Sequence, residues 1–416
     1  MICESYSNRM CRKLEGVNKI YANLMYNKVD ELSGLSYLET LDHLRKAPTE
    51  GLAPLANGTT WGGEYMNMWI VGSYTVPAEL EGKSLWIIPH TDAYETLYFR
   101  NGTPDGIFNS KGDYMGIMHS VQVLTQNAKA GETIDVALEC YAGHFQVDEK
   151  PYNYYGIDDP KGGSYKHTFT SIDVCVINEE IYDFVFNLNI ATQMAQKLDV
   201  NNYVRARART ACEQVFASII QYPAHYSAEK VQASVVKSNA ILREFLTKSK
   251  SDSSRGKVGI IGSSHLDTAW LWTVAETVRK SARTFSNVCA LMDRYPEYTF
   301  LQSSALHLDW LKRQYPDLFE RISKYIKEGR YEPNGGVWVE CDCNITSGEL
   351  MARQFLYGQL YTRKHFDYTA DCFWLPDTFG YNAAIPQIML ESDVKYFYTT
   401  KMSWNDLNRF PFTTFK

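Results

Sequence analysis

The sequence predicts a multidomain protein in which a β-sandwich-like domain with accompanying helices precedes an α/β domain. The first observation is length, because 416 residues exceed what one hydrophobic core usually holds. The second is a series of short β-rich runs between residues 51 and 178, separated by Gly, Asn and Asp turns. The third is a strand–helix alternation from residue 256 onward, which is typical of a parallel sheet or barrel.

Residues 1–50 are expected to be an N-terminal helical segment, with amphipathic helices at Val17–Met25 and Tyr37–Arg45. Residues 51–178 follow as the β-sandwich-like domain, in which Asn101-Gly102 is a hairpin signal. The expected strands are Met68–Tyr74, Ser84–Pro89, Thr96–Arg100, Gly116–Leu124 and Thr133–Tyr141. A sugar-binding role and a role in bracing the neighbouring domain are both open for this part.

Residues 179–250 form a helical connector. Its helices are expected at Glu179–Lys197, Val200–Gln221 and Ala228–Lys248, with Ser227 as the N-cap of the third. The polar stretch Ser249–Gly256 reads as a linker to the last domain.

Residues 256–416 are the α/β part. Its expected strands are Lys257–Ser263, Tyr298–Ser304, Tyr331–Glu340, Ala370–Leu375 and Lys395–Thr400. Helices are expected between them, up to Arg294, up to Glu328, at Ser347–His365 and up to Leu390. In such folds the loops after the strands' carboxyl ends carry the functional site.

Charge, apolar runs and cysteine pattern indicate which partners and which cellular compartment to expect. A net charge of −6 argues against a nucleic-acid partner, and no apolar run is long enough to cross a membrane. The nine cysteines are scattered and form no C-x-x-C pair, which is typical of reduced thiols in a cytosolic protein. No secretory signal is visible at the N-terminus, so we expect a cytoplasmic location. Association into a homo-oligomer is compatible with the sequence.

His265 and Asp267 follow the first strand of the α/β part. In an extended segment residues i and i+2 point the same way, so this pair can offer a nitrogen and an oxygen to one metal ion. His307 and Asp309 repeat the letters H-L-D, with Trp310 directly after them, inside an expected helix, where such positions diverge by about 200°. We therefore expect only the first copy to bind metal and interpret the second as surface polarity.

Asp377 lies just past the expected strand Ala370–Leu375, before a Gly turn into a new helix. It either caps that helix or joins His265 and Asp267 at the same sheet edge. A His-Asp-Asp ligand set suits Zn²⁺. Glu340 and Asp342 can line the same pocket, whereas Cys341 and Cys343 form an isolated C-x-C without partners. Lys401 is the next cation at this edge.

Three runs in the α/β part resemble family 38 glycoside hydrolases, the zinc-dependent retaining α-mannosidases. They are VGIIGSSHLDTAWLW from Val258, GGVWVECDCNITSGELMARQFLYGQ from Gly335, and WLPDTFGYNAAIPQI from Trp374. The W-L-P-D-[ST]-F-G-Y form is similar to the cytosolic, vacuolar and bacterial subgroup. The resemblance covers residues 257–416 and implies a (β/α)7-type barrel.

The resemblance also implies a role for each matching residue. His265 and Asp267 would be zinc ligands, and Asp377 both a zinc ligand and the catalytic nucleophile. Trp270 would form the sugar-facing wall, Phe379 would lie beside the nucleophile, and Lys401 would stand on the substrate side. The implied activity is retaining hydrolysis of terminal α-mannosyl residues in oligosaccharides by double displacement, with Zn²⁺, or Co²⁺ in its place, gripping the sugar hydroxyls.

One departure from the family pattern affects both fold and activity. In the family a fourth zinc ligand, a His, and the general acid, an Asp, follow well after the nucleophile. In this sequence the last His is His365, and the chain stops at Lys416. The resemblance therefore implies a barrel that is incomplete in this chain, only weak metal binding, and no turnover by these residues alone.

Two other classes remain open. A metal-dependent polysaccharide deacetylase also uses His and Asp ligands on a strand–helix barrel, but it would cleave an acetyl group with metal-bound water. The W-L-P-D-T-F-G-Y run counts against it. A non-catalytic carbohydrate-binding protein is the second alternative, with the β-rich domain holding sugar.

Overall fold

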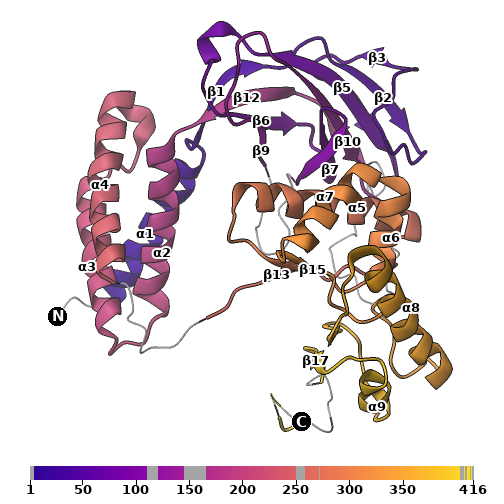
Figure 1. Cartoon of the computed structure of the whole chain (residues 1–416). Helices are drawn as coiled ribbons and strands as arrows, with labels where there is room; N and C mark the ends of the chain where they lie inside the picture. The colour runs from indigo at the N-terminus through magenta and orange to yellow at the C-terminus, as the bar shows by residue number, and fades with distance from the viewer. Residues whose placement is uncertain are drawn as a thin grey trace.

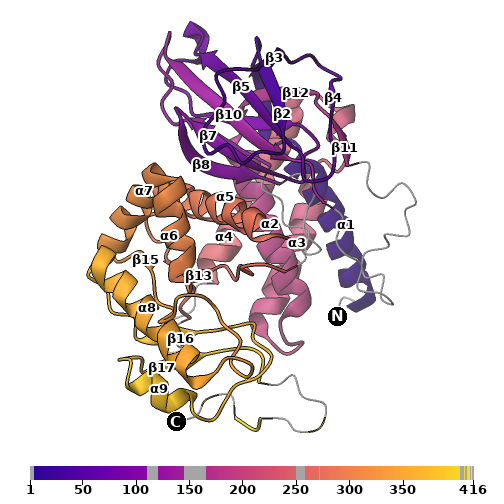
Figure 2. The ribbon, with the colours of Figure 1, turned by 90° about the vertical axis from the view of Figure 1, so that its right-hand side faces the viewer.

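The computed structural model describes residues 4–109, 120–144, 165–249, 258–270 and 272–402, with residues 407, 410–412 and 414. It contains a helical bundle, a two-sheet sandwich and a mixed strand–helix part at the C-terminal end of the chain (Figures 1 and 2). Among these residues no helix has the length and apolar character needed to cross a membrane.

The sandwich consists of two antiparallel sheets. The larger has the strand order β3-β2-β5-β10-β7-β8, the smaller the order β1-β12-β6-β9, and a separate pair joins β4 to β11. The bounds are β1 Tyr26–Glu31, β2 Ser36–Thr40, β3 Ala53–Pro54, β4 Thr60–Gly62, β5 Asn67–Thr75, β6 Leu85–His90, β7 Glu95–Arg100, β8 Thr103–Phe108, β9 Gln122–Thr125, β10 Thr133–Tyr141, β11 Lys166–Thr168 and β12 Ser171–Ile177. The hairpin expected at Asn101-Gly102 joins β7 to β8.

Side-chain alternation decides what each face of the larger sheet contacts. On β5, Met68 and Ile70 point into the core between the sheets, whereas Trp69 points to the opposite face. That opposite face packs on helix α5 (Val274–Arg294), and Leu97 and Phe99 of β7 contribute to the same contact. The larger sheet is therefore buried on both faces, which explains the long apolar runs of its central strands.

The expected helix at Tyr37–Arg45 is wrong. Residues Ser36–Thr40 form β2, which pairs with both β3 and β5, and Tyr26–Glu31 form β1 against β12. The apolar spacing of Tyr37, Leu41 and Leu44 fits a helix, but pairing with strands distant in the sequence satisfies the backbone instead. Of the described residues up to Glu50, those in a helix belong to α1, Glu4–Ala22.

Helix α1 packs with three later helices into a four-helix bundle (Figure 1). These are α2 Glu179–Lys197, α3 Tyr203–Ser218 and α4 Ala228–Lys248. The side chains of Asn178, Asn202 and Ser227 cap their first turns, as expected for Ser227. Apolar residues of all four helices, among them Leu14 and Leu188, form one core.

In the α/β part, parallel strands alternate with helices. Strands β13 Gly262–Ser263, β14 Phe300–Leu301 and β15 Tyr331–Glu332 form one parallel sheet, and β16 Cys372–Trp374 pairs in parallel with β17 Tyr396–Tyr398. The helices after α5 are α6 Ala305–Gln314, α7 Pro316–Lys327, α8 Gly348–Phe366 and α9 Ile385–Leu390. Short 3-10 turns lie elsewhere, at Ala78–Leu80 and Pro223–His225.

Several elements differ from the sequence expectation. The strands of the α/β part are shorter than expected: of Tyr331–Glu340 only the first two residues form a strand, and Val337 adds an isolated bridge to Ser304. The helix expected up to Glu328 is divided into α6 and α7, because Pro316 lacks the N–H to continue α6 and starts α7 instead. The first four residues of the expected strand Gly116–Leu124, Lys257, and all of the expected linker except Ser249 lie outside the described residues.

Candidate functional site

The candidate site lies where chain segments leave the parallel strands of the α/β part. His265 and Asp267 follow β13, Ser303 follows β14, and Asp377 follows β16. Two further residues, Glu340 in the segment after β15 and Lys401 after β17, reach the same place. Carboxyl ends of parallel strands meet at one edge, so segments distant in sequence converge here.

His265 is the centre of this group. Its Nε2 atom lies 3.3 Å from Oδ1 of Asp267 and 3.4 Å from Oδ2 of Asp377. The other ring nitrogen, Nδ1, donates to Oε2 of Glu340 at 2.6 Å. The structure thus brings together the three expected ligand residues and adds Glu340.

Glu340 holds the imidazole in orientation. Its second oxygen accepts a hydrogen bond from the Ser303 hydroxyl, and its backbone N–H donates to Oγ of Ser304 at 3.2 Å. The carboxylate is nearly buried, so its position is fixed by the end of β14. In metal sites, a histidine ligand usually donates the N–H of its other ring nitrogen to a carboxylate or a similar acceptor, which fixes the orientation of the ring.

Neighbouring carboxylates change the protonation of His265. Burial lowers the pKa of His265, but its contacts with Asp267 and Glu340 outweigh burial and raise that pKa to about 10. In the absence of a cation, the imidazolium itself therefore balances the surrounding negative charge.

The donor chemistry of this group fits Zn²⁺. Zinc ligands at about 2.0–2.2 Å in a tetrahedron stand roughly 3.3–3.5 Å apart, and the two separations from His265 Nε2 match that spacing. As they stand, the residues that the structure describes include no group of three or more His, Cys, Asp or Glu side chains ready to hold a metal ion. The features that suit Zn²⁺ are the donor types, the two separations from His265 Nε2 and the Glu340 contact.

Lys401 and Phe379 lie beside Asp377. Nζ of Lys401 lies 2.7 Å from Oδ1 of Asp377 and 5.2 Å from the centre of the Phe379 ring. Phe379 is 70% exposed and Trp270 is 57% exposed. The exposed Phe379 ring, next to the Lys401–Asp377 pair, can therefore meet a ligand that approaches Asp377 from solvent.

Some nearby residues have other roles than expected. The Oδ1 atom of Asp342 accepts hydrogen bonds from the backbone N–H groups of Asn344 and Ile345, which shape the turn that it begins. Cys341 and Cys343 are buried in an apolar cluster. His307 lies on helix α6, as expected, but it is only 1% exposed, so its interpretation as surface polarity is wrong.

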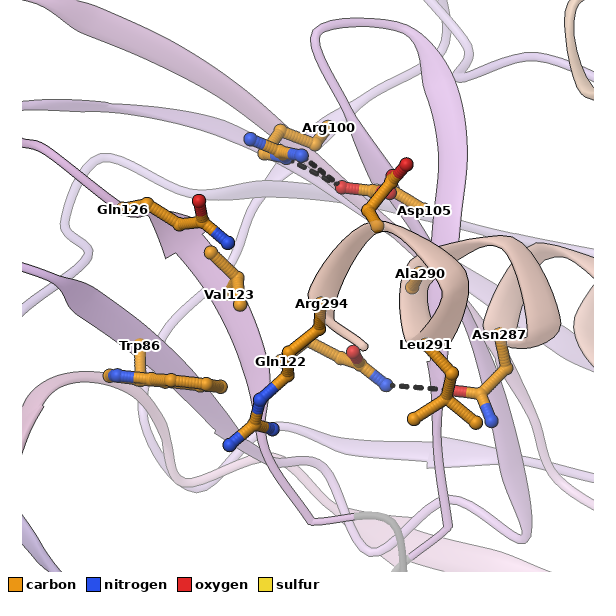
Figure 3. A pocket seen from close by; sticks show the side chains of 11 residues that line it. Trp86, Arg100, Asp105, Gln122, Val123, Gln126, Asn287, Ala290, Leu291 and Arg294 are labelled. Atoms are coloured by element: carbon orange, nitrogen blue, oxygen red, sulfur yellow. Dashed lines mark hydrogen bonds and ion pairs between the residues drawn. The ribbon is translucent and has the colours of Figure 1, made fainter. Parts of the chain in front are cut away.

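A separate cavity of about 300 Å³ lies between the sandwich and α5 (Figure 3). It is lined by residues that include Trp86, Arg100, Asp105, Gln122 and Arg294, and it shares no residue with the His265 group. Arg100 pairs with Asp105, and Gln122 donates to Asn287 of α5, so its polar walls are joined across the domain junction (Figure 3).

Comparison with known proteins identifies the part of the chain that carries the site. Residues 255–416 match the Glycosyl hydrolases family 38 N-terminal domain. These residues are a family 38 domain. The family 38 domain contains His265, Asp267, Glu340, Asp377 and Lys401, which are the residues that the strand ends bring together.

Three curated relatives extend the likeness. Alpha-mannosidase G of Dictyostelium discoideum is 30% identical over 360 residues, 86% of this chain and 32% of its own length. Mouse alpha-mannosidase 2C1 is 31% identical over 379 residues, 89% of this chain and 34% of its own. Saccharomyces cerevisiae alpha-mannosidase is 48% identical over 156 residues, 37% of this chain and 14% of its own.

The first two relatives match the sandwich and the bundle as well as the family 38 domain, because their alignments cover most of the chain. The chain spans about a third of the length of each. A solved β-glucuronidase from Ruminococcus gnavus covers 37% of this chain and 28% of its own at 12% identity, with a TM-score of 0.25, a likeness too weak to define a fold.

Proposed function

We propose that this protein is an α-mannosidase that hydrolyses terminal α-mannosyl residues of oligosaccharides with retention of configuration. One observation carries the proposal: the Asp377 carboxylate lies between His265 and Lys401, and the exposed Phe379 ring lies beside Lys401. The names of the curated relatives support the substrate class. The parallel strands β13 to β17 would belong to a (β/α)7-type barrel. In support of this, the side chain of Asn334, just after β15, forms two hydrogen bonds with Asp371, just before β16.

In this proposal Asp377 is the nucleophile. Its carboxylate forms a bond to the anomeric carbon while the bond to the leaving oxygen breaks, and water later hydrolyses the glycosyl ester. Lys401 attracts the carboxylate and restricts its orientation through the 2.7 Å contact with Oδ1. Trp270 and Phe379 would form an apolar wall for the sugar ring.

His265, Asp267 and Asp377 would hold Zn²⁺ or Co²⁺, and Glu340 would orient His265. When bound, the cation would supply Lewis-acid attraction for neighbouring sugar hydroxyls. The chain's own contribution is to hold three donors, one of which is also the nucleophile, at one strand edge.

The test is hydrolysis of p-nitrophenyl α-D-mannopyranoside by the product of the complete open reading frame, with added Zn²⁺ or Co²⁺. Asp377→Asn keeps the shape of the side chain but removes the nucleophilic charge, so we expect kcat to fall by at least about 1000-fold. Asp309→Asn is the matched control, because Asp309 pairs with Arg313 on the helix that carries the second H-L-D copy.

Three outcomes would overturn parts of the proposal. Full activity of Asp377→Asn would remove this residue from the role of nucleophile. Release of acetate from acetylated sugars, without mannoside hydrolysis, would indicate a deacetylase instead. Binding of mannosides without any turnover would indicate a carbohydrate-binding protein.

A further inference from the structure

The segment that carries His265 and Asp267 leaves a strand of only two residues, so the strand by itself gives it little support. Its support comes from helix α5. The hydroxyl of Thr277, in the first turn of α5, donates to the backbone oxygen of Thr268 at 2.7 Å and lies 3.4 Å from that of Asp267. Thr277 is fully buried, so this contact does not compete with water.

The same hydroxyl closes the other end of the segment. Nε1 of Trp272 donates to Oγ1 of Thr277 at 3.0 Å. One side chain on a helix therefore holds the backbone directly after Asp267 and the indole of Trp272. A single hydroxyl can do this because it donates one hydrogen bond and accepts others.

Contacts from the sandwich support this arrangement. Nζ of Lys280, one turn further along α5, lies 4.9 Å from the centre of the Trp272 ring and 2.9 Å from Oε1 of Glu95. Glu95 belongs to β7 of the larger sheet and also pairs with Arg283 at 2.7 Å. An ion pair thus connects the sandwich to the ring that Thr277 holds.

We propose that Thr277 is a positioning residue for the metal site, and that Trp272, Lys280 and Glu95 extend its support to the β-sandwich. Thr277 acts through the backbone at Asp267–Thr268 and fixes the direction of the Asp267 carboxylate toward His265 Nε2. The inference rests on the metal site of the proposed function. Groups that orient metal ligands typically change metal affinity 10- to 100-fold when they are removed.

The side chain of Thr268 has a contact of its own, separate from the contact that Thr277 makes with the Thr268 backbone. Its hydroxyl lies 3.3 Å from Nε2 of buried His307, whose other ring nitrogen lies 3.3 Å from Nε2 of Gln302. The side chain of Thr268 would therefore keep an anchor after loss of the Thr277 hydroxyl, whereas its backbone oxygen would lose the contact that aligns Asp267.

The test compares Thr277→Val with Thr277→Ser in the 416-residue chain and in the complete open reading frame. Valine has the shape of threonine without the hydroxyl, whereas serine keeps the hydroxyl and loses a methyl group. We expect Zn²⁺, measured by calorimetric titration, to bind about 10-fold more weakly to Thr277→Val. Thr277→Ser should stay within about threefold of the wild type.

Two further readouts separate positioning from general loss of stability. The visible absorption of bound Co²⁺ reports ligand geometry and should change in Thr277→Val but not in Thr277→Ser. Lys280→Met, which keeps the stem over Trp272 and removes the pair with Glu95, should weaken Zn²⁺ binding in the same direction by a smaller factor. Circular dichroism would show that each variant is folded at the titration temperature.

The outcomes distinguish this inference from the proposed function. Equal Zn²⁺ affinity in Thr277→Val and wild type would overturn the positioning role while mannoside hydrolysis stands. Equal weakening by valine and serine would also overturn it, because the hydroxyl would not be the cause. A wild type that binds Zn²⁺ but hydrolyses no α-mannoside would overturn the proposed function and leave the positioning role intact.

Discussion

The side chain of His307 lies in the interior, beside Phe285 and stacked on Trp310. Burial and, to a smaller extent, the positive charge of His265 together lower its pKa to about 4. The unfolded chain has an ordinary histidine at this position, with a pKa near 6.5. The folded state therefore binds fewer protons than the unfolded state between these two values, and folding stability falls as pH drops through that window.

We predict that His307→Gln makes the protein less sensitive to mild acid. Between pH 8 and pH 5 the wild type should lose about 2 kcal/mol more of its unfolding free energy than the variant does. Urea unfolding at the two pH values measures both losses. Burial also lowers the pKa of His43, which is present in both proteins. Its contribution to the pH dependence therefore cancels when the two losses are compared. If wild type and variant lost the same unfolding free energy, protonation of His307 would not destabilise the folded state.

Sequence identified His265, Asp267 and Asp377 because each stands beside a strand end, and the structure places them together. The orienting contact of Glu340 could only be suspected. It depends on the path of the segment after β15, which leaves strand geometry at Glu332 and approaches β14 again through Ser303 and Ser304. The apolar periodicity of the sequence does not indicate how the segment after β15 runs through space.

At the scale of elements, the helices were predicted best where capping residues and apolar spacing within the helix itself determine its ends. Helices α2 and α4 have the expected bounds, and Ser227 caps α4 as expected. Strand β2 was missed because its apolar spacing fits a helix and its pairing with β5 involves residues far along the chain. The strands of the α/β part were predicted too long for the same reason, because the extent of pairing with neighbouring strands determines strand length.

Helix α5 joins two parts of the molecule through buried charge. Glu139 of β10 lies 3.6 Å from Nε of Arg279, while Glu276 and Arg283 of α5 pair with each other nearby. Burial raises the pKa of Glu139 to about 7, although Arg279 and Arg283 lower it. The folded state then holds a proton that the unfolded state has released between about pH 4.5 and 7, so stability falls as pH rises through this window.

We predict that Glu139→Gln removes this loss. From pH 5 to pH 8 the wild type should lose about 2.5 kcal/mol relative to the variant, because glutamine has no charge to bury. The measurement is the midpoint of guanidinium unfolding at both pH values. If the variant were less stable than the wild type at pH 8, the charged form of Glu139 would be stabilising and the predicted sign would be wrong.

At the scale of the whole molecule, the described residues divide into cores that do not follow the chain order. Apolar residues of the larger sheet and of the α/β part, such as Trp69 and Phe285, share one cluster. The four helices of the bundle have a separate cluster, to which the fully buried Leu188 belongs. The sequence indicated a boundary near residue 250, but it held no sign that α5 would pack on a sheet formed by residues 36–141.

We predict two unfolding transitions. Tryptophan fluorescence reports only the sandwich and the α/β part, because all nine tryptophans lie outside residues 4–22 and 179–248. Circular dichroism at 222 nm reports both. Leu188→Ala should lower stability by about 2–5 kcal/mol in the transition seen only by circular dichroism, and Phe285→Ala by about 3–5 kcal/mol in the fluorescent one. A single transition shifted by either change would show that the cores unfold together.

The packing of α1 on helices near residue 200 has a consequence for synthesis. The apolar side of α1, with Cys11, Leu14 and Tyr21, contacts α2 and α3, so its partners leave the ribosome long after it does. At roughly 5–20 residues per second, translation from α1 to α4 takes on the order of tens of seconds. During that interval a nascent chain presents an amphipathic helix without its partners, which makes α1 the segment where chaperones would first engage this protein.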